Sequence, residues 1–234
     1  MKVKLRIAVI AAAVLVVVLL VAWFWFQNRP MEKLPTVEPP TGAQLLLFPM
    51  KDGLITAGYR NPTYLEKNNF THYGTDLTSA DGGKAEILAS GSGIVLGTEF
   101  CDNSLGHIVV IRYDNVFLPQ TGEIISLIAR YYHMTGLEVS KGDVLHTGQV
   151  IGAINDKHRW YNHIHIEFDT DLEYPFNTPQ VAEATSALLN RYPASGEGMP
   201  DPISVLAVGK DQRIFVHPLS DCCTEKDNPQ FAQK

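Results

Sequence analysis

The apolar residues of this chain follow two patterns, one uninterrupted and one broken into short runs. Residues 7–26 contain no charged side chain, and a helix of that length spans roughly 30 Å, the thickness of a bilayer's hydrocarbon core. Three basic residues precede this segment and two tryptophans lie near its end, as is typical of membrane-spanning helices. The pattern predicts a transmembrane signal-anchor over residues 7–26, preceded by a cytoplasmic N-terminus over residues 1–6.

Two other interpretations of this segment stay open. A cleaved signal peptide has a shorter apolar core and a small-residue cleavage site, whereas this segment ends in "WFWF". A buried core helix is the third interpretation. With an anchor or a cleaved signal, the rest of the chain lies outside the cytoplasm, in the periplasm or at the cell surface. A disulfide is permitted there, so that Cys101 could pair with Cys222 or Cys223, and free thiols are the alternative.

After the apolar segment the composition changes twice. Residues 27–46 contain four prolines and mixed charge, which predicts an extended linker. From residue 47 to residue 171, short runs rich in β-branched residues alternate with glycine-bearing turns. This pattern indicates an all-β fold, a small antiparallel sheet or open barrel. We assign this domain to residues 47–180.

The last part of the chain predicts a short α/β extension, residues 181–234. The segment 178–192, "TPQVAEATSALLNRY", predicts a helix capped by Thr178. The runs "ISVLAV" and "RIFVHP" predict a terminal hairpin. The net charge of the whole chain is -6, so the sequence lacks the basic footprint of a nucleic-acid-binding protein.

Histidines next to acidic residues supply the candidate chemistry. In "HIHIE", a strand would place His163, His165 and Glu167 on one face. Two neighbouring imidazoles suit a metal, or one ligand and one base. Taken alone, such a pair is more often a surface accident.

Two further motifs contain residues of the same type. In "THYGTD", His72 and Asp76 are four residues apart, and the intervening Gly74 permits a bend that turns both side chains to one point. In "RYYHM", Tyr131 and His133 share a strand face by the period-two argument. A catalytic zinc needs three protein ligands and an open position for water, which leaves two histidines for proton transfer and transition-state stabilisation.

In this order, "HYGTD", "YYHM" and "HIHIE" resemble the HxGxD, YxH and HxHxE motifs of the lysostaphin/LytM-type zinc metallopeptidases, family M23. The segment "SKGDVLHTGQVIGAI" is similar to the family's hairpin before the HxH strand. The resemblance covers roughly residues 47–171. It implies a small antiparallel β-sheet domain with its site in a groove.

Carried over motif by motif, the resemblance implies that Zn²⁺ is bound by three residues: His72, Asp76 and His165. It implies that His133 and His163 are the catalytic histidines. We expect Glu167 to support the site from behind a ligand and Tyr131 to line the groove; a salt-bridged Glu167 and a packed Tyr131 are equally open. Tyr132 stands where the family has alanine, and we expect this change to reshape the groove wall.

The resemblance implies an endopeptidase that hydrolyses peptide bonds in the stem peptides of bacterial peptidoglycan while the N-terminal helix holds it to the membrane. One alternative is a catalytically silent LytM-like domain that binds the wall or activates another hydrolase. Another is a zinc peptidase that acts on a protein or a free peptide. The sequence identifies neither the bond that is cleaved nor a regulatory partner.

Overall fold

The computed structural model describes residues 13–22, 38–101, 104–154, 162–181, 186–191 and 198–217. Residues 13–22 are helical. Among the residues in these ranges, no helix is both long and apolar enough to cross a bilayer. The rest of the predicted anchor, residues 27–37 of the predicted linker and the tail from residue 218 lie outside the described residues.

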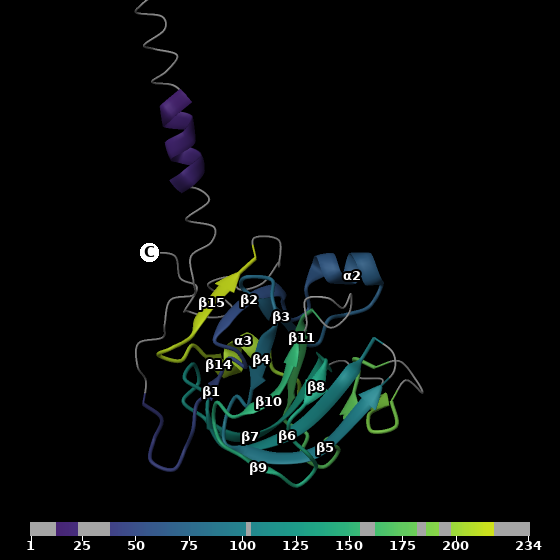
Figure 1. The fold of residues 1–234 in the computed structure, drawn as a ribbon. Coiled ribbons are helices and arrows are strands. Elements are labelled where there is room, and N and C mark those ends of the chain that lie inside the picture. Colours follow the sequence, from purple (N-terminus) through teal and green to yellow (C-terminus); the bar gives the residue numbers. More distant parts are fainter. Residues whose placement is uncertain are drawn as a thin grey trace, which may run out of the picture.

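The centre of the fold is an eight-stranded, mostly antiparallel sheet (Figure 1). Its strands, in spatial order, are β15 (Arg213–Val216), β2 (Asp52–Ala57), β3 (Thr75–Ser79), β11 (Ile164–Asp169), β7 (Ile124–Met134), β6 (Gly106–Phe117), β5 (Gly93–Cys101) and β9 (Val144–Leu145). Only β15 pairs in parallel, with β2. The predicted all-β class is confirmed, and the runs read as strands between residues 85 and 169 are strands.

One face of the large sheet packs against smaller elements and forms the main core. These elements are β4 (Ala85–Leu88), β10 (Val150–Ile154) and β8 (Gly136–Leu137), which form a three-stranded sheet, and β1 (Leu46–Leu47), β14 (Leu206–Ala207) and α3 (Pro202–Val205). The core between them includes Ile164, Ile166 and Phe168 of β11. The alternation in "HIHIEF" is therefore confirmed, because every second side chain of this strand enters the core.

The opposite face of the sheet is covered by chain that follows β11. Here β12 (Asn177–Thr178) pairs in parallel with β13 (Asn190–Arg191). Val181 and Leu189 pack with Ile108, Val110 and other apolar residues of β5, β6 and β7 in a second buried cluster. The sheet is thus buried on both faces over these strands, and the face that carries the second cluster also carries the polar residues of β7 and β11.

The prediction of a helix over residues 178–192 is wrong for the described residues. Thr178 lies in β12 and is buried instead of capping a helix, and Asn190–Arg191 is a strand. Helix propensity is a weak preference that burial overrides, and here Val181 and Leu189 are buried against the sheet. Both apolar side chains therefore lie on the face of the large sheet.

The predicted terminal hairpin is also wrong. Asp201 caps the short helix α3, and β14 and β15 pair in parallel with β1 and β2 instead of with each other. Both strands reach the core in this way, because Leu206 and Ile214 are completely or almost completely buried. From the predicted C-terminal extension, β15 therefore joins the large sheet and β14 joins the core beside β1.

Two smaller differences concern the ends of elements. Gln44 and Leu46 fall within the predicted linker, but Gln44 bridges to Val116 of β6 and Leu46 is buried in β1. The sequence analysis also missed the short helix α2 (Pro62–Asn68), which begins after the side-chain cap of Asn61 and ends at the left-handed Asn69. This helix lies beside the loop that leads into β3 (Figure 1).

Candidate metal centre

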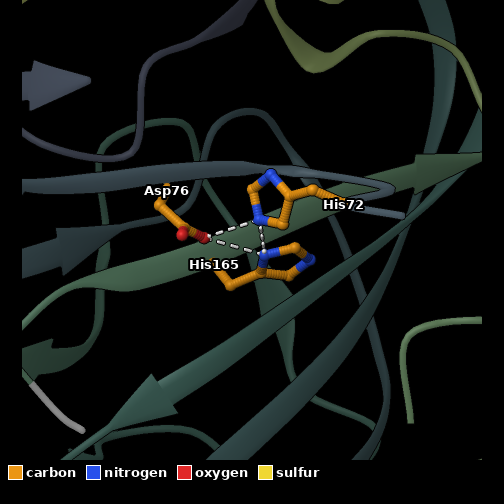
Figure 2. Close-up of side chains that lie close together, drawn as sticks. All are labelled: His72, Asp76 and His165. Carbon is orange, nitrogen blue, oxygen red and sulfur yellow. Dashed lines mark hydrogen bonds and ion pairs between the residues drawn. The ribbon is translucent and has the colours of Figure 1, made fainter. Parts of the chain in front are cut away.

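Two neighbouring antiparallel strands and one loop bring the three predicted metal ligands together. Asp76 of β3 lies directly opposite His165 of β11, and residues in such a cross-strand pair have their Cβ atoms only about 5 Å apart. His72 lies in the loop before β3. All three side chains are buried, and their tips converge on one point (Figure 2).

The spacing of the three tips suits a tetrahedral ion. His72 Nε2 lies 3.0 Å from Asp76 Oδ1 and 2.9 Å from His165 Nδ1. His165 Nδ1 lies 2.9 Å from Asp76 Oδ1. Zinc bonds of about 2.0–2.1 Å at tetrahedral angles place ligand atoms about 3.3 Å apart. With a small outward movement, the three atoms would therefore fit three of the four positions around such an ion.

The hydrogen bonds behind the ligands support the same interpretation. His72 Nδ1 donates to the carbonyl oxygen of Gly58 over 2.7 Å, so its Nε2 carries a lone pair that faces the other two tips. Asp76 offers a carboxylate, because burial, which would raise its pKa, is outweighed by His72 and His165, which hold that pKa well below its usual value. His72 Nε2 and Asp76 Oδ1 both carry lone pairs and lie only 3.0 Å apart. They repel each other unless a proton or a metal ion lies between them.

A proton can supply the positive charge when the ion is absent. Burial alone would lower the pKa of His165, but its contacts with Asp76 and Glu167 outweigh burial and raise that pKa to about 9. The site therefore attracts positive charge at the point where the three tips meet, and a metal ion competes there with a proton on His165.

Gly74 is required by close packing, whereas the sequence analysis expected it to permit a bend. A Cβ atom at this position would lie 2.4 Å from His165 Nε2 and 2.5 Å from the carbonyl oxygen of Ile166. Gly74 is also not among the residues with positive φ. The imidazole of His165 therefore lies directly against the backbone of the loop that connects His72 to β3.

The two predicted catalytic histidines lie side by side next to the ligands. The ring centroids of His133 and His163 are 4.8 Å apart, and those of His133 and His165 are 6.2 Å apart. His163 Nε2 is 4.0 Å from Asp76 Oδ2. The structure thus gathers all five predicted residues at one site.

His133 reaches this site through an unusual backbone conformation. We expected its side chain to share a strand face with Tyr131. This prediction is wrong, because Tyr131 points into the main core, whereas His133 lies beside His163. At His133 the φ angle is 67°, a left-handed conformation that is uncommon for a residue other than glycine. This conformation breaks the alternation of β7 and brings the imidazole to His163.

Both histidines present a neutral imidazole near neutral pH. Burial, reinforced by the neighbouring histidines His163 and His165, lowers the pKa of His133 to about 3, and burial also lowers the pKa of His163. His133 Nδ1 donates to the carbonyl oxygen of Ser104 over 2.6 Å, which leaves Nε2 as its basic atom. His163 Nδ1 contacts Asn162 Oδ1 at 3.0 Å.

Two expectations about tyrosines are wrong. Tyr131 does not line a groove, since it is fully buried and its hydroxyl contacts Tyr113 and Ser90, each at 2.9 Å. Tyr132 is equally buried and does not form a groove wall, because it lies opposite His165 in the sheet and donates to Glu167 Oε1 over 2.8 Å.

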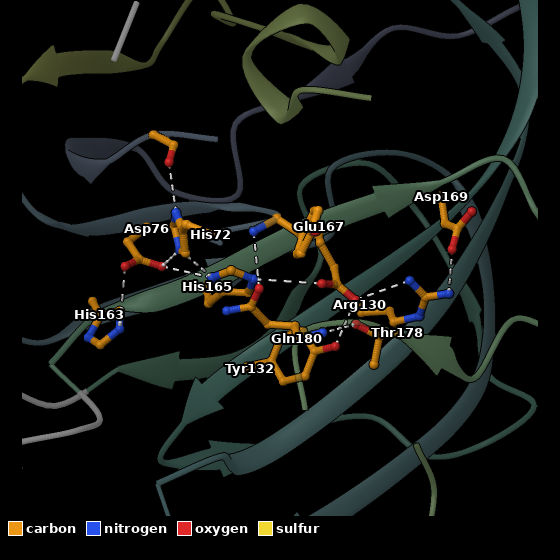
Figure 3. A network of polar contacts seen from close by, with 12 residues as sticks. His72, Asp76, Arg130, Tyr132, His163, His165, Glu167, Asp169, Thr178 and Gln180 are labelled. Atoms are coloured by element: carbon orange, nitrogen blue, oxygen red, sulfur yellow. Dashed lines mark hydrogen bonds and ion pairs between the residues drawn. The ribbon is translucent and has the colours of Figure 1, made fainter. Parts of the chain in front are cut away.

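Glu167 lies behind the metal centre, on the expected side of His165. Its Oε2 is 3.8 Å from His165 Nε2. The sequence analysis missed a buried arginine, Arg130, which binds Glu167 and Asp169 (Figure 3). A charged residue inside the apolar run "SLIARYYHM" was the available signal, because arginine is almost never fully buried without a partner.

Comparison with known proteins identifies this domain. Residues 70–177 match the family model described as "Peptidase family M23". This domain belongs to peptidase family M23. The match spans every residue of the candidate M23 site, from His72 to Glu167.

Several solved structures are distantly similar to this chain. The SpoIIQ-SpoIIIAH pore-forming complex is 22% identical over 56% of this chain and 86% of its own, with a TM-score of 0.43. A zinc-containing peptidase from Vibrio cholerae is 23% identical over 54% and 37%, with a TM-score of 0.39. Lysostaphin from Staphylococcus simulans is 18% identical over 67% and 49%, with a TM-score of 0.41. A search of curated proteins found no match.

Proposed function

We propose that the protein is a zinc-dependent endopeptidase that hydrolyses peptide bonds in peptidoglycan. The observation that carries this proposal is that five side chains of an M23 domain meet at one site. Three of them present a ligand atom to a common point, and two neutral imidazoles lie beside that point. A structural zinc site uses four protein ligands, whereas a catalytic site keeps one position open.

His72, Asp76 and His165 would hold the zinc ion. When bound, zinc supplies a Lewis acid that polarises a carbonyl group and lowers the pKa of a water molecule. The residues of the chain then have to move protons and to orient the substrate. His133 and His163 are neutral and carry a basic nitrogen next to the site, so one of them takes the proton from the attacking water. That histidine then returns the proton to the leaving amine, and the other histidine hydrogen-bonds the developing oxyanion or the water.

The backbone around His133 prepares it for this role. Its Nδ1–H is fixed by the carbonyl oxygen of Ser104, which selects the tautomer with a basic Nε2. The left-handed conformation of His133 costs conformational energy. A strained conformation persists only where the surrounding structure enforces it. Here the conformation of His133 places its imidazole beside His163.

The choice of substrate rests on the family and on the N-terminal segment. M23 motifs resemble those of peptidases that act on cell-wall peptides, and the apolar run 7–26 would anchor the domain to the membrane, where wall peptides are within reach. The segment 27–46 would give the domain that reach. We propose a location outside the cytoplasm on this basis.

A catalytically silent domain of the same fold is the second candidate. It would bind wall or activate another hydrolase without cutting a bond. The complete set His72, Asp76 and His165, together with two neutral histidines, favours the enzyme over this candidate, because a binding module has no need of a metal site with an open position.

A digest of purified peptidoglycan tests the proposal. The full-length chain, kept in detergent, is incubated with wall material, and the released fragments are identified by mass spectrometry. We expect new peptide termini that disappear with EDTA and return with added zinc. Binding of the chain to wall without new termini would favour the silent domain, and cleavage that is insensitive to EDTA would refute the role of the metal.

A further inference from the structure

Arg130 is the largest fully buried side chain among the described residues. It lies on β7 directly opposite Glu167 of β11, two cross-strand pairs along from His165. Burying a guanidinium costs several kcal/mol unless its hydrogen bonds and its charge are compensated. Arg130 is two residues from Tyr132, which is the cross-strand partner of His165. A buried arginine so close to a predicted metal ligand therefore requires an explanation.

The guanidinium spreads its donors over three acceptors. Nη1 donates to Glu167 Oε1 over 3.1 Å, Nη2 donates to Asp169 Oδ2 over 2.9 Å, and Nε donates to the carbonyl oxygen of Pro175 over 2.9 Å (Figure 3). The planar fork of arginine can serve three acceptors at once, which a single ammonium group cannot do in this geometry.

These contacts fix one oxygen of Glu167 and leave the other directed at the metal centre. Oε1 accepts from Arg130 and, over 2.8 Å, from the hydroxyl of Tyr132. Within the described part of the chain, Oε2 has no hydrogen-bond partner, and neither has Nε2 of His165. These two atoms are 3.8 Å apart, and Figure 3 shows them facing each other.

We propose that Arg130 is a positioning residue for the metal centre, acting through Glu167 on the ligand His165. Arg130 and Tyr132 hold the carboxylate so that Oε2 faces His165 Nε2. This places a carboxylate behind the imidazole and favours the ring orientation in which Nδ1 faces Asp76 and His72. A carboxylate behind a ligating imidazole fixes the ring and makes it a better ligand. The inference rests on the proposed zinc site.

The arrangement of charge is consistent with this role. One guanidinium faces two carboxylates, Glu167 and Asp169, so the cluster keeps an excess negative charge. The part of that charge on Glu167 Oε2 lies on the side of His165. A purely structural role would be served as well by well-packed apolar side chains, which can replace a buried ion cluster without loss of stability.

Zinc affinity, measured by chelator competition on the full-length chain in detergent, tests the proposal without relying on catalysis. We expect Arg130→Met to weaken zinc binding by about 10–100-fold, the usual effect of losing a partner behind a metal ligand. The absorption bands of the cobalt-substituted protein should shift as well, because the imidazole of His165 loses its orientation. Arg112→Met is the matched control: this arginine pairs with Asp114 on the exposed part of β6, and its loss should leave both readouts unchanged.

A triple variant separates positioning from folding. Arg130→Met leaves two buried carboxylates without a positive counter-charge and is expected to lose stability. Adding Glu167→Leu and Asp169→Leu removes those charges, so thermal stability should return towards that of the natural chain while zinc affinity stays low. If the folded triple variant binds zinc within about threefold of the natural chain, Arg130 has only a structural role and the proposal is wrong.

Two further results complete the test. Tyr132→Phe removes only a hydroxyl group, which donates one of the hydrogen bonds to Glu167 Oε1, so it remains informative if the Arg130 variants fail to fold. We expect it to weaken zinc binding several-fold. Unchanged zinc affinity would contradict the proposal. A natural chain that binds no zinc would overturn this inference together with the proposed function. A chain that binds zinc through this network but does not cleave wall would overturn the proposed function alone.

Discussion

Replacing Gly74 with alanine is the smallest change that should damage the metal centre. The added Cβ would lie 2.4 Å from His165 Nε2 and 2.5 Å from the carbonyl oxygen of Ile166. The carbonyl oxygen belongs to the backbone of β11, which is hydrogen-bonded to a strand on either side. The strain therefore falls on the imidazole of His165 and on the loop that carries His72.

The size of the effect follows from the distances. Ordinary van der Waals contact begins at 3.4 Å, so His165 Nε2 has to recede by about 1 Å from the new methyl group. Metal ligands tolerate deviations of only about 0.2 Å from their bond lengths. We expect zinc affinity to fall by about 10–100-fold, or about 1.4–2.7 kcal/mol, and the free energy of unfolding without metal to fall by about 1–3 kcal/mol through overpacking.

Chelator competition measures the affinity, and denaturant unfolding in EDTA measures the stability. Gly136→Ala is the matched control, because a Cβ atom at Gly136 meets nothing within 4 Å; both quantities should stay close to those of the natural chain. A Gly74→Ala variant that binds zinc as tightly as the natural chain would refute the close packing of His165 against this loop.

Three other predictions concern the roles of individual groups. His133→Ala and His163→Ala should each abolish wall cleavage in fragment analysis but keep the bound zinc; near-normal turnover in either variant would remove that residue from the mechanism. Tyr131→Phe should lower the free energy of unfolding by about 1 kcal/mol in a denaturant titration and leave cleavage unchanged, since the hydroxyl is buried in the core; a loss of cleavage without a loss of stability would return Tyr131 to the groove. Removal of zinc with EDTA should lower the melting temperature, because a ligand present at a hundredfold excess over its Kd stabilises the folded state by about 2.7 kcal/mol; an unchanged melting curve would contradict zinc binding to the folded chain.

The sequence predicted the strand β11 and its two faces because strand periodicity is a local property. His163, His165 and Glu167 fall on one side of the strand, and the apolar residues between them fall on the other. Periodicity also located the sheet-forming runs along the chain. It could not show which strands become neighbours, so only the resemblance to a family placed His165 and Asp76 at one site, and their cross-strand pairing was not predicted.

The features that the sequence missed depend on contacts between distant parts of the chain. The conformation of His133, with its φ of 67°, is set by Ser104 and Leu105 of another turn, which bind its ring and its backbone. The pairing of Arg130 with Glu167 requires the register of β7 against β11. The local pattern shows an unusual arginine in an apolar run but not its partner, and period-two reasoning gave His133 the wrong face.

The segment after β11 was misread for a related reason. Its alanines and leucines favour a helix on local propensity. The fold instead offers an apolar face of β5, β6 and β7, where Val181 and Leu189 are buried. Burial on the sheet is a tertiary effect, and a sequence window of that length contains no information about it.

X-ray diffraction at the zinc absorption edge, on crystals of the zinc-loaded chain, shows directly whether the ion lies where the three ligand atoms meet. We expect one anomalous peak about 2.0–2.2 Å from each of three atoms: His72 Nε2, Asp76 Oδ1 and His165 Nδ1. A zinc-loaded crystal with no peak at this point, or with its peak held by other residues, would show that these three residues do not form the zinc site.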